Sequence, residues 1–349
     1  MGIEFGGFLL RYITMKSSAI FVISLFAILS GYAVAQAGDA YKAPRTEYGQ
    51  PDFQGVWNFS SNTPFLRPEE FGDREYMTPE ETRERFERTL SVQEEGSRSA
   101  EGVGGYNTFW FEMAGRGDNY RTSLITYPLN GQLPEIAEGA EHQFGGLGDD
   151  IPGQRPVRFV VGGIGKDGPE DRGLSERCII GFNSGPPFLP SGYNNNLQII
   201  QHKDHVVIMT EMVHDARIVP LDRDHALHDD IRLWSGDSLG YWEGETLVVE
   251  TRNFSGFTQS LPPFRSADYG TAYHKTLTER FTRVDPFTIN YEFTLVDPST
   301  FTDKIEAMVP MAKLDGLMYE YACHEGNYGL LNTLRGARIE ERGVASGNQ

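Results

Sequence analysis

The sequence contains little cysteine and little positive charge. Its 349 residues include two cysteines, Cys178 and Cys323, and 31 lysines and arginines against 49 aspartates and glutamates, a formal net charge of -18. So acidic a surface repels phosphate backbones, which excludes nucleic acid as an expected partner. Two cysteines in an oxidising compartment most often pair, so we predict a Cys178–Cys323 disulfide. The alternative is a reactive Cys323 beside His324.

Long apolar runs are also absent, apart from one near the N-terminus. There Met15 and Lys16 precede the apolar stretch 19–29, and small residues at 33–37 offer cleavage sites. This arrangement is typical of a secretory signal peptide, residues 1–35, and the apolar stretch is too short for a permanent membrane span. We therefore expect a periplasmic or secreted bacterial protein that keeps no stable membrane association after cleavage.

Several familiar motifs are incomplete or missing. Residues 162–167 resemble a phosphate-binding loop, but Val160 stands where its first glycine belongs. The serine of 181–185 is one position late for a nucleophile elbow. The sequence has neither an HExxH zinc motif nor a CxxC pair. We therefore predict no cofactor and no metal site.

The second half of the sequence is rich in short segments that suit β-strands. In 287–296, apolar side chains occupy every second position, which is typical of an antiparallel sheet with one polar face. Successive strands joined by tight turns favour an all-β fold, an antiparallel up-and-down, lipocalin-like barrel with a few peripheral helices and long N-terminal loops. The predicted strands of this half are 197–201, 205–212, 215–221, 246–252, 275–283, 287–296, 301–311 and 318–323.

The chain divides into four expected regions, which are a signal peptide (1–35), a loop-rich segment (36–175), the barrel (176–325) and a C-terminal helix and tail (326–349). The loop-rich segment either wraps the barrel or forms a second, partial barrel. One helix is predicted in it at 78–95, because Thr78, Pro79 and Glu81 form a capping box with proline at the first helical position. Shorter strands are predicted at 55–59, 120–127 and 157–161. Residues 253–274 are expected to form a lid or binding loop.

The first candidate functional group is His214-Asp215-Ala216-Arg217. On a strand, Asp215 and Arg217 share one face while His214 points to the other. His214 inside the barrel would act as a general acid or base near neutral pH. The alternative is a surface Asp215–Arg217 pair with an incidental histidine.

The second candidate group lies at the end of the last predicted strand. Tyr321, His324, Glu325 and Asn327 would transfer protons or hold a polar substrate group at the barrel rim. The alternative is a cap, in which Glu325 and Asn327 accept hydrogen bonds from the first amides of the C-terminal helix.

A third group contains aromatic and acidic residues. Trp242 with Asp237 and Glu243 suits carbohydrate stacking and a glycosidase carboxylate pair. The alternative is that Trp242 seals the bottom of the barrel beside a hairpin turn. Tyr193 and Asn194 precede a predicted strand, where they form either a pocket wall or a turn.

Several of these segments together resemble an uncharacterised family of exported bacterial proteins. The resemblance covers nearly all of the mature chain and implies no particular activity or catalytic residue. A weaker resemblance to lipocalin-like proteins is carried by Gly-x-Trp at 55–57 and 240–242, and it implies an apolar cavity. The segments that carry the family resemblance are 51–57, 190–196, 214–217, 240–244, 279–284 and 319–328.

These observations predict an exported barrel that binds a small, partly apolar molecule, acting as a cofactor-independent lyase, hydratase or isomerase. Two alternatives remain open. A carrier or sensor of a lipophilic ligand would keep both histidines outside the barrel or in satisfied hydrogen bonds, and a glycoside-active enzyme would need Asp237 or Glu243 to face another carboxylate. In the leading hypothesis the catalytic residues are His214, His324, Asp215, Glu325 and Asp237, and the substrate-binding residues are Tyr193, Asn194, Arg217, Trp242, Tyr321 and Asn327.

Overall fold

The computed structural model describes residues 41–99, 112, 120–140, 142–144, 165–224, 227–264 and 267–347. The predicted signal peptide and the predicted strand at 157–161 lie outside these residues. Lys42–Gln349 forms one compact unit. None of the described helices is both long and apolar enough to cross a membrane.

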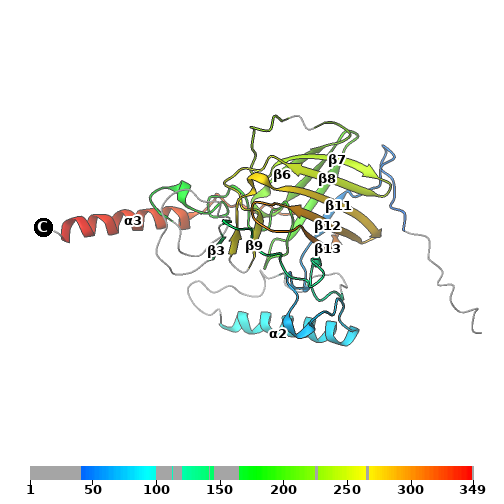
Figure 1. Cartoon of the computed structure of the whole chain (residues 1–349), viewed down its shortest axis with the longest axis horizontal. Coiled ribbons are helices and arrows are strands. Elements are labelled where there is room, and N and C mark those ends of the chain that lie inside the picture. Colours follow the sequence, from blue (N-terminus) through cyan, green and yellow to red (C-terminus); the bar gives the residue numbers. More distant parts are fainter. Residues whose placement is uncertain are drawn as a thin grey trace, which may run out of the picture. The chain divides into compact units, whose positions relative to one another are not determined.

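A large antiparallel sheet dominates the described part of the chain (Figure 1). Ten of the described strands belong to it; one of them, β2 (Ile125–Tyr127), only adds to β13, which leaves nine around the barrel. Their order is β6 (Ala216–Pro220), β5 (His205–Thr210), β4 (Asn196–Gln201), β1 (Gly55–Asn58), β13 (Ile305–Leu314), β12 (Thr288–Val296), β11 (Thr276–Asp285), β8 (Thr246–Arg252) and β7 (Asp237–Glu243).

The sheet closes between β6 and β7. With nine alternating strands the first and last run in the same direction, so the closing contact must be parallel. Leu221, directly after β6, forms a parallel bridge with Gly240 of β7, and the amide of Asp222 donates to the Gly240 carbonyl at 3.0 Å. A Cβ atom on Gly240 would lie 2.9 Å from the side chains of Leu221 and Val219, so the close approach requires glycine. The predicted all-β antiparallel barrel is confirmed.

One predicted strand is absent and one observed strand was not predicted, each for a physical reason. Residues 318–323 form no strand, because the side chains there are exposed or half-buried and no face of the segment is covered by a core. Strand β7 was not predicted, because small residues (Ser238 and Gly240) stand at its buried positions, so the usual apolar alternation is missing. Residues 253–274 also contain two short strands, β9 (Leu261–Phe264) and β10 (Ala267–Tyr269), which form a small sheet with β3 (His142–Phe144).

The wall of the barrel is uneven. Strands β11, β12 and β13 have ten, nine and ten residues, whereas β1, β4, β5 and β6 have four, six, six and five. The short β1 pairs only with the C-terminal part of β13 (Asn58↔Ala312), and β2 pairs near its N-terminal part (Ala307↔Ile125). Residues 181–195 lie beside the short strands: the Phe188 ring packs against Tyr291, and the Phe59 amide donates to the Asn195 carbonyl at 2.8 Å.

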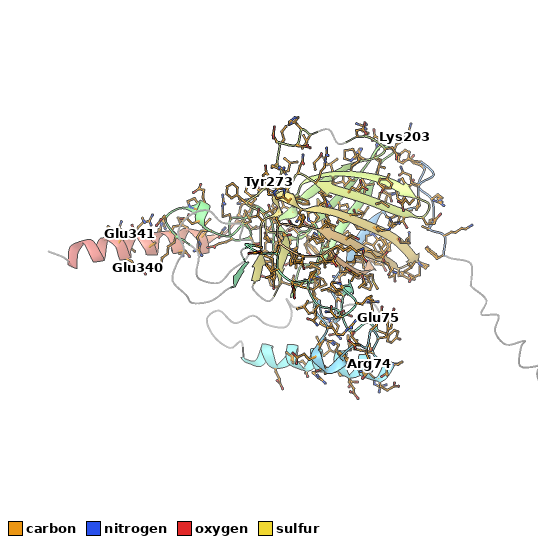
Figure 2. The ribbon with its side chains drawn as sticks, in the orientation of Figure 1. Arg74, Glu75, Lys203, Tyr273, Glu340 and Glu341 are labelled. Carbon is orange, nitrogen blue, oxygen red and sulfur yellow. A yellow bond between two sulfur atoms is a disulfide. The ribbon has the colours of Figure 1, made fainter. Side chains whose placement is uncertain are left out.

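The two ends of the barrel have different connections. At one, which we name the hairpin end, tight turns join β4 to β5, β7 to β8 and β11 to β12. At the other, the loop end, lie the β5–β6 and β12–β13 connections and the longer segments that precede β4 and follow β8. In Figure 2, Lys203 marks the hairpin end and Tyr273 marks the loop end.

Large side chains fill the barrel interior. The predicted alternation is present in β12, where Ile289, Tyr291, Phe293 and Leu295 are buried and their neighbours are not. One cluster of buried residues joins all sides of the barrel. Burying each large apolar side chain contributes about 1.5–3 kcal/mol. The largest fully buried side chains are Trp57, Tyr291, Phe53, Phe59, Phe188, Phe254, Lys275, Phe281, Phe293, Phe301 and Leu124.

Two α-helices are described outside the barrel. The capping box of α2 (Pro79–Ser99) is present: the Thr78 amide donates to the Glu81 carboxylate at 2.8 Å, and the Glu81 amide donates to Thr78 Oγ1 at 3.2 Å. The helix ends at Ser99, four residues past its predicted end at residue 95. Helix α3 (Tyr328–Gly347) follows Asn327, whose side-chain oxygen accepts from the Leu330 amide at 3.4 Å.

Candidate functional site

The hairpin end is closed by residues 51–53. Gln201 of β4 holds this segment at both ends, because its Oε1 accepts from the Phe53 amide at 2.6 Å and its Nε2 donates to the Pro51 carbonyl at 2.9 Å. Trp57 Nε1 donates to the Phe53 carbonyl at 2.8 Å. The Phe53 ring packs against Trp242, with ring centres 5.7 Å apart. This placement matches the interpretation that Trp242 seals the bottom of the barrel.

A buried ion pair crosses the interior from β6 to β11. Arg217 donates to both carboxylate oxygens of Glu279, with Nη2 and Oε1 3.0 Å apart. The Tyr291 hydroxyl donates to Glu279 Oε1 at 2.9 Å and accepts from the Phe188 amide at 3.1 Å. The Arg217 guanidinium lies 5.6 Å from the centre of the Phe188 ring. Buried charges need such partners, because an unpaired charge in the interior is very costly.

The charge states of this network follow from its geometry. Burial lowers the pKa of Arg217, but the adjoining Glu279 carboxylate more than offsets that effect, so the pKa lies above its usual value. Burial and the charge of Glu279 raise the pKa of Tyr291 well above that of a free phenol. Arg217 is therefore charged and Tyr291 neutral at physiological pH. The sequence predicted Arg217 as a substrate-binding residue, and the structure engages its guanidinium with Glu279.

Carboxylates and amides form a second network at the loop end, where β1 and β5 end and β4 begins. Glu112 Oε2 accepts from the amide and from Nδ2 of Asn195, at 3.0 and 3.1 Å, and from Asn58 Nδ2 at 3.3 Å. Asn58 Nδ2 also donates to Asn196 Oδ1 at 2.8 Å. Asn196 Nδ2 then donates to Glu211 Oε2 at 2.7 Å. Hydrogen-bonded asparagines thus link the two carboxyl groups, Glu112 and Glu211.

Glu211 is the acid of this network whose pKa is raised by burial. It directly follows β5 and is 7% exposed. Burial raises the pKa of its carboxyl group; the hydrogen bond from Asn196 acts in the opposite direction, and the charge of Glu112 adds to the rise. A buried carboxyl with a raised pKa beside a second carboxylate is suited to general acid–base chemistry. Glu211 was not predicted from the sequence, although 196 and 211 are equally distant from the predicted 203–204 turn, which brings them together.

The predicted binding residues Tyr193 and Asn194 belong to the segment that leads into this network. Asn183 Nδ2 donates to the backbone carbonyls of Tyr193 and Asn194, at 3.2 and 3.1 Å. Asn194 adopts a left-handed backbone (φ 53°), as the turn interpretation expects of asparagine. The Tyr193 ring packs edge-on against Phe182, with centres 5.5 Å apart. Both residues therefore border the asparagine–carboxylate network.

The predicted disulfide is confirmed and lies beside the same network. Cys178 and Cys323 are bonded, with Cα atoms 5.7 Å apart and a sequence separation of 145. Met212 and Val213, which follow Glu211, pack against Cys178 in one small apolar cluster. Val213 adopts a left-handed backbone (φ 63°), which is strained for a β-branched residue. Asn327 also joins this region, because its Nδ2 donates to the Glu176 carbonyl at 2.8 Å.

The two predicted catalytic histidines lie on the surface. His214 is exposed, and its Nδ1 lies 3.3 Å from the Tyr321 carbonyl. His324 and Glu325 are exposed in the segment that follows. Asp215 accepts a hydrogen bond from Ser235 Oγ at 3.0 Å. Within the described chain, neither histidine is hydrogen-bonded to a carboxylate that was expected to orient it, and His214 lies outside the barrel interior.

Asp237 and Glu243 stand at opposite ends of β7. Six residue steps along a strand separate them by roughly 20 Å. A glycosidase needs its two carboxyl groups about 5–10 Å apart. These two residues therefore do not face each other as a glycosidase pair, and Glu243 is engaged with Arg280 at 2.7 Å on the exposed surface.

Unpartnered polar atoms mark another part of the loop end. Gln259 Nε2 and Oε1 and Ser260 Oγ are buried and have no hydrogen-bond partner among the described residues. Both residues are fully buried in the connection between β8 and β11. Buried polar groups in proteins are almost always paired with protein or ordered water. A polar ligand group or a water molecule would satisfy these three atoms.

Comparison of the chain with protein-family models, with curated proteins and with solved structures gives no match.

Proposed function

We propose that the protein is an exported β-barrel that binds a small, partly apolar molecule at its loop end and exchanges a proton with it through Glu211. The observation that carries the proposal is the buried Glu211 carboxyl, with its raised pKa, linked through Asn196 and Asn58 to Glu112. The unpartnered atoms of Gln259 and Ser260 add polar groups at the same end of the barrel. Such groups position a ligand by hydrogen bonding.

The surroundings of Glu211 suit a partly apolar ligand. Met212 and Val213 begin the apolar cluster beside it, and the Tyr193 ring packs against that cluster. Reactions that need only proton transfer are those of a lyase, hydratase or isomerase, so these classes are the first to assay. Export is supported by the N-terminal signal pattern and by the disulfide, because structural disulfides persist in oxidising compartments.

A carrier without catalytic activity is the second candidate. The specific observation that favours it is that His214 and His324 are both exposed. A carrier is expected to keep both histidines outside the barrel, because it needs no proton-transfer group in the interior. A carrier would bind its ligand without changing it. The charged Arg217–Glu279 pair in the interior makes the barrel less apolar than a lipid carrier requires.

A small-molecule thermal-shift screen followed by product analysis tests the proposal. We expect compounds that raise the melting temperature of the wild-type protein and that are converted on incubation. Glu211→Gln keeps the size of the side chain but cannot exchange the proton, so it should retain binding and lose turnover. Glu292→Gln, on the exposed face of β12, is the matched control and should leave both unchanged. Unchanged turnover in Glu211→Gln would overturn the catalytic role, and binding without any turnover in the wild type would favour the carrier.

A further inference from the structure

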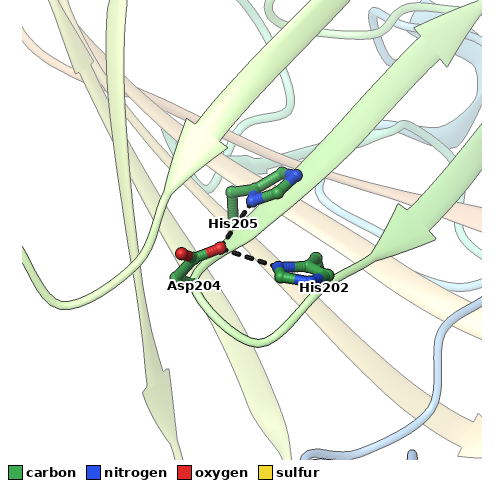
Figure 3. A group of neighbouring side chains, drawn as sticks. All are labelled: His202, Asp204 and His205. Atoms are coloured by element: carbon green, nitrogen blue, oxygen red, sulfur yellow. Dashed lines mark hydrogen bonds and ion pairs between the residues drawn. The ribbon is translucent and has the colours of Figure 1, made fainter.

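The turn between β4 and β5 brings two histidines and an aspartate together at the hairpin end (Figure 3). His202 and His205 flank the two-residue turn, and the His202 amide donates to the His205 carbonyl at 2.9 Å. This pairing places both imidazoles on one side of the hairpin, with ring centres 4.8 Å apart. Asp204 Oδ1 lies between them, 2.8 Å from His202 Nδ1 and 2.7 Å from His205 Nδ1.

We propose that His202, Asp204 and His205 bind a divalent transition-metal ion, of which zinc is the representative case. One donor atom from each residue lies within 4.8 Å of the others. Imidazole nitrogen and carboxylate oxygen bind zinc at about 2.0–2.2 Å, which places neighbouring ligands of a tetrahedral site about 3.3 Å apart. Asp204 Oδ1 therefore needs to move about 0.5 Å away from each imidazole nitrogen, and the two imidazole nitrogens, which lie within 4.8 Å of each other, need to lie about 3.3 Å apart. The three side chains are exposed enough to make these movements. This site lies away from the proposed ligand site at the loop end and does not depend on it.

Contacts from other segments hold this turn in place. The Leu221 amide donates to the Asp204 carbonyl at 2.9 Å, and Gln50 Nε2 donates to the Lys203 carbonyl at 3.2 Å. The Tyr48 ring packs against His202, with centres 5.4 Å apart. A site held by its supporting residues loses less conformational entropy when it binds an ion.

The local charges also favour a cation. The Asp204 carboxylate supplies an anionic oxygen ligand directly between the two imidazoles. Arg223 is the competing cation, with Nη2 3.6 Å from Asp204 Oδ2, but that ion pair is exposed and screened by solvent. Removal of Arg223 should therefore strengthen metal binding.

Calorimetric titration of the untagged protein with ZnCl₂ tests the site. We expect one saturable zinc ion per chain, no comparable binding of Mg²⁺, which prefers oxygen ligands, and tighter zinc binding by Arg223→Gln. His202→Gln, His205→Gln and Asp204→Asn should each weaken zinc binding by about tenfold or more, because loss of even an outer-shell partner costs that much.

His228→Gln is the matched control for these variants. His228 is also exposed and also faces an aspartate, Asp230 at 3.2 Å, but among the described residues no second histidine joins this pair. We expect this variant to bind zinc like the wild type. The proposal is overturned if the wild-type protein shows no saturable zinc binding, or if the three turn variants bind as tightly as the His228→Gln control. Zinc should also raise the melting temperature of the wild type and leave that of His205→Gln unchanged.

Discussion

The hairpin end and the loop end of the barrel are built in different ways. At the hairpin end, short turns join the strands, and residues 51–53 close the opening through hydrogen bonds to Gln201 and Trp57. At the loop end the connections are longer, and they contain a buried acid with a raised pKa, unpartnered polar atoms and a strained backbone at Val213. Proteins commonly place function on loops positioned by a rigid scaffold. The hairpin end is therefore a closed end with short connections, and the loop end is the one at which we propose that the small molecule binds.

The largest expected effect concerns the ion pair in the interior. Glu279→Ala leaves Arg217 as an unpaired buried charge, so we expect a loss of about 3–5 kcal/mol in the free energy of unfolding. The neighbouring Arg280→Ala removes an exposed ion pair with Glu243 and should cost about 0–1 kcal/mol. Urea unfolding of both variants measures the difference. Similar losses in the two variants would show that the interior pair is not the strongly coupled element described above.

The disulfide is expected to hold the loop end together. Replacing Cys178 and Cys323 by serine should cost about 2–4 kcal/mol, because the bond closes a loop of 145 residues in the unfolded chain. Limited proteolysis of the variant should cut first in the segments around 175–180 and 321–328, while the hairpin turns resist. Early cleavage at the hairpin end would contradict the division between the two ends.

Substitution of two glycines, one at each end of the barrel, compares the packing of the two ends. Gly244, in the β7–β8 turn, has φ 62° and open space where a Cβ would stand, so Gly244→Ala should cost about 1 kcal/mol of backbone strain. Gly236, just before β7 at the loop end, has φ 73°, and a Cβ there would lie 2.6 Å from Thr251 and 2.8 Å from the Arg252 carbonyl. Gly236→Ala should cost a further ~1–3 kcal/mol from the clash. Thermal unfolding with equal shifts for both variants would contradict this difference.

The smallest expected effect is the pH dependence caused by Glu211. The pKa of Glu211 is higher in the folded than in the unfolded protein. Between these two pKa values the folded state therefore binds more protons than the unfolded state. The stabilisation that protonated Glu211 gives is complete only below the usual pKa of a glutamate. The free energy of unfolding therefore falls as pH rises from that value through the raised pKa of Glu211. Glu211→Gln should remove this slope and be more stable than the wild type at neutral pH. Urea unfolding between pH 4 and pH 8 measures it, and a less stable variant at neutral pH would contradict the assignment.

The sequence predicted those parts of the fold that local pattern determines. The alternation in 287–296 and the capping box at Thr78 both identify their elements, because a buried face and a cap leave a clear signal in neighbouring residues. A closed barrel was predicted from the succession of strands and turns, but the contact that closes it was not. It depends on Gly240 and on small residues in β7, whose role arises only when β6 and β7 meet.

The candidate site was predicted only in part. Tyr193, Asn194, Asn327 and the disulfide were all named from the sequence, and the structure brings them to one region at the loop end. Glu211 was missed because its raised pKa comes from burial and from Glu112, which is 99 positions away in sequence. The cluster at His202 was also missed, since two histidines in a turn gain meaning only when Asp204 is found between them.

Hydrogen–deuterium exchange in the presence of a compound from the thermal-shift screen tests the central claim most directly. The division between the two ends predicts that the compound slows exchange in 181–196, 211–215 and 256–262, with no change in 202–205 and 243–246. Protection centred on the turns of the hairpin end, with none around Glu211, would contradict it.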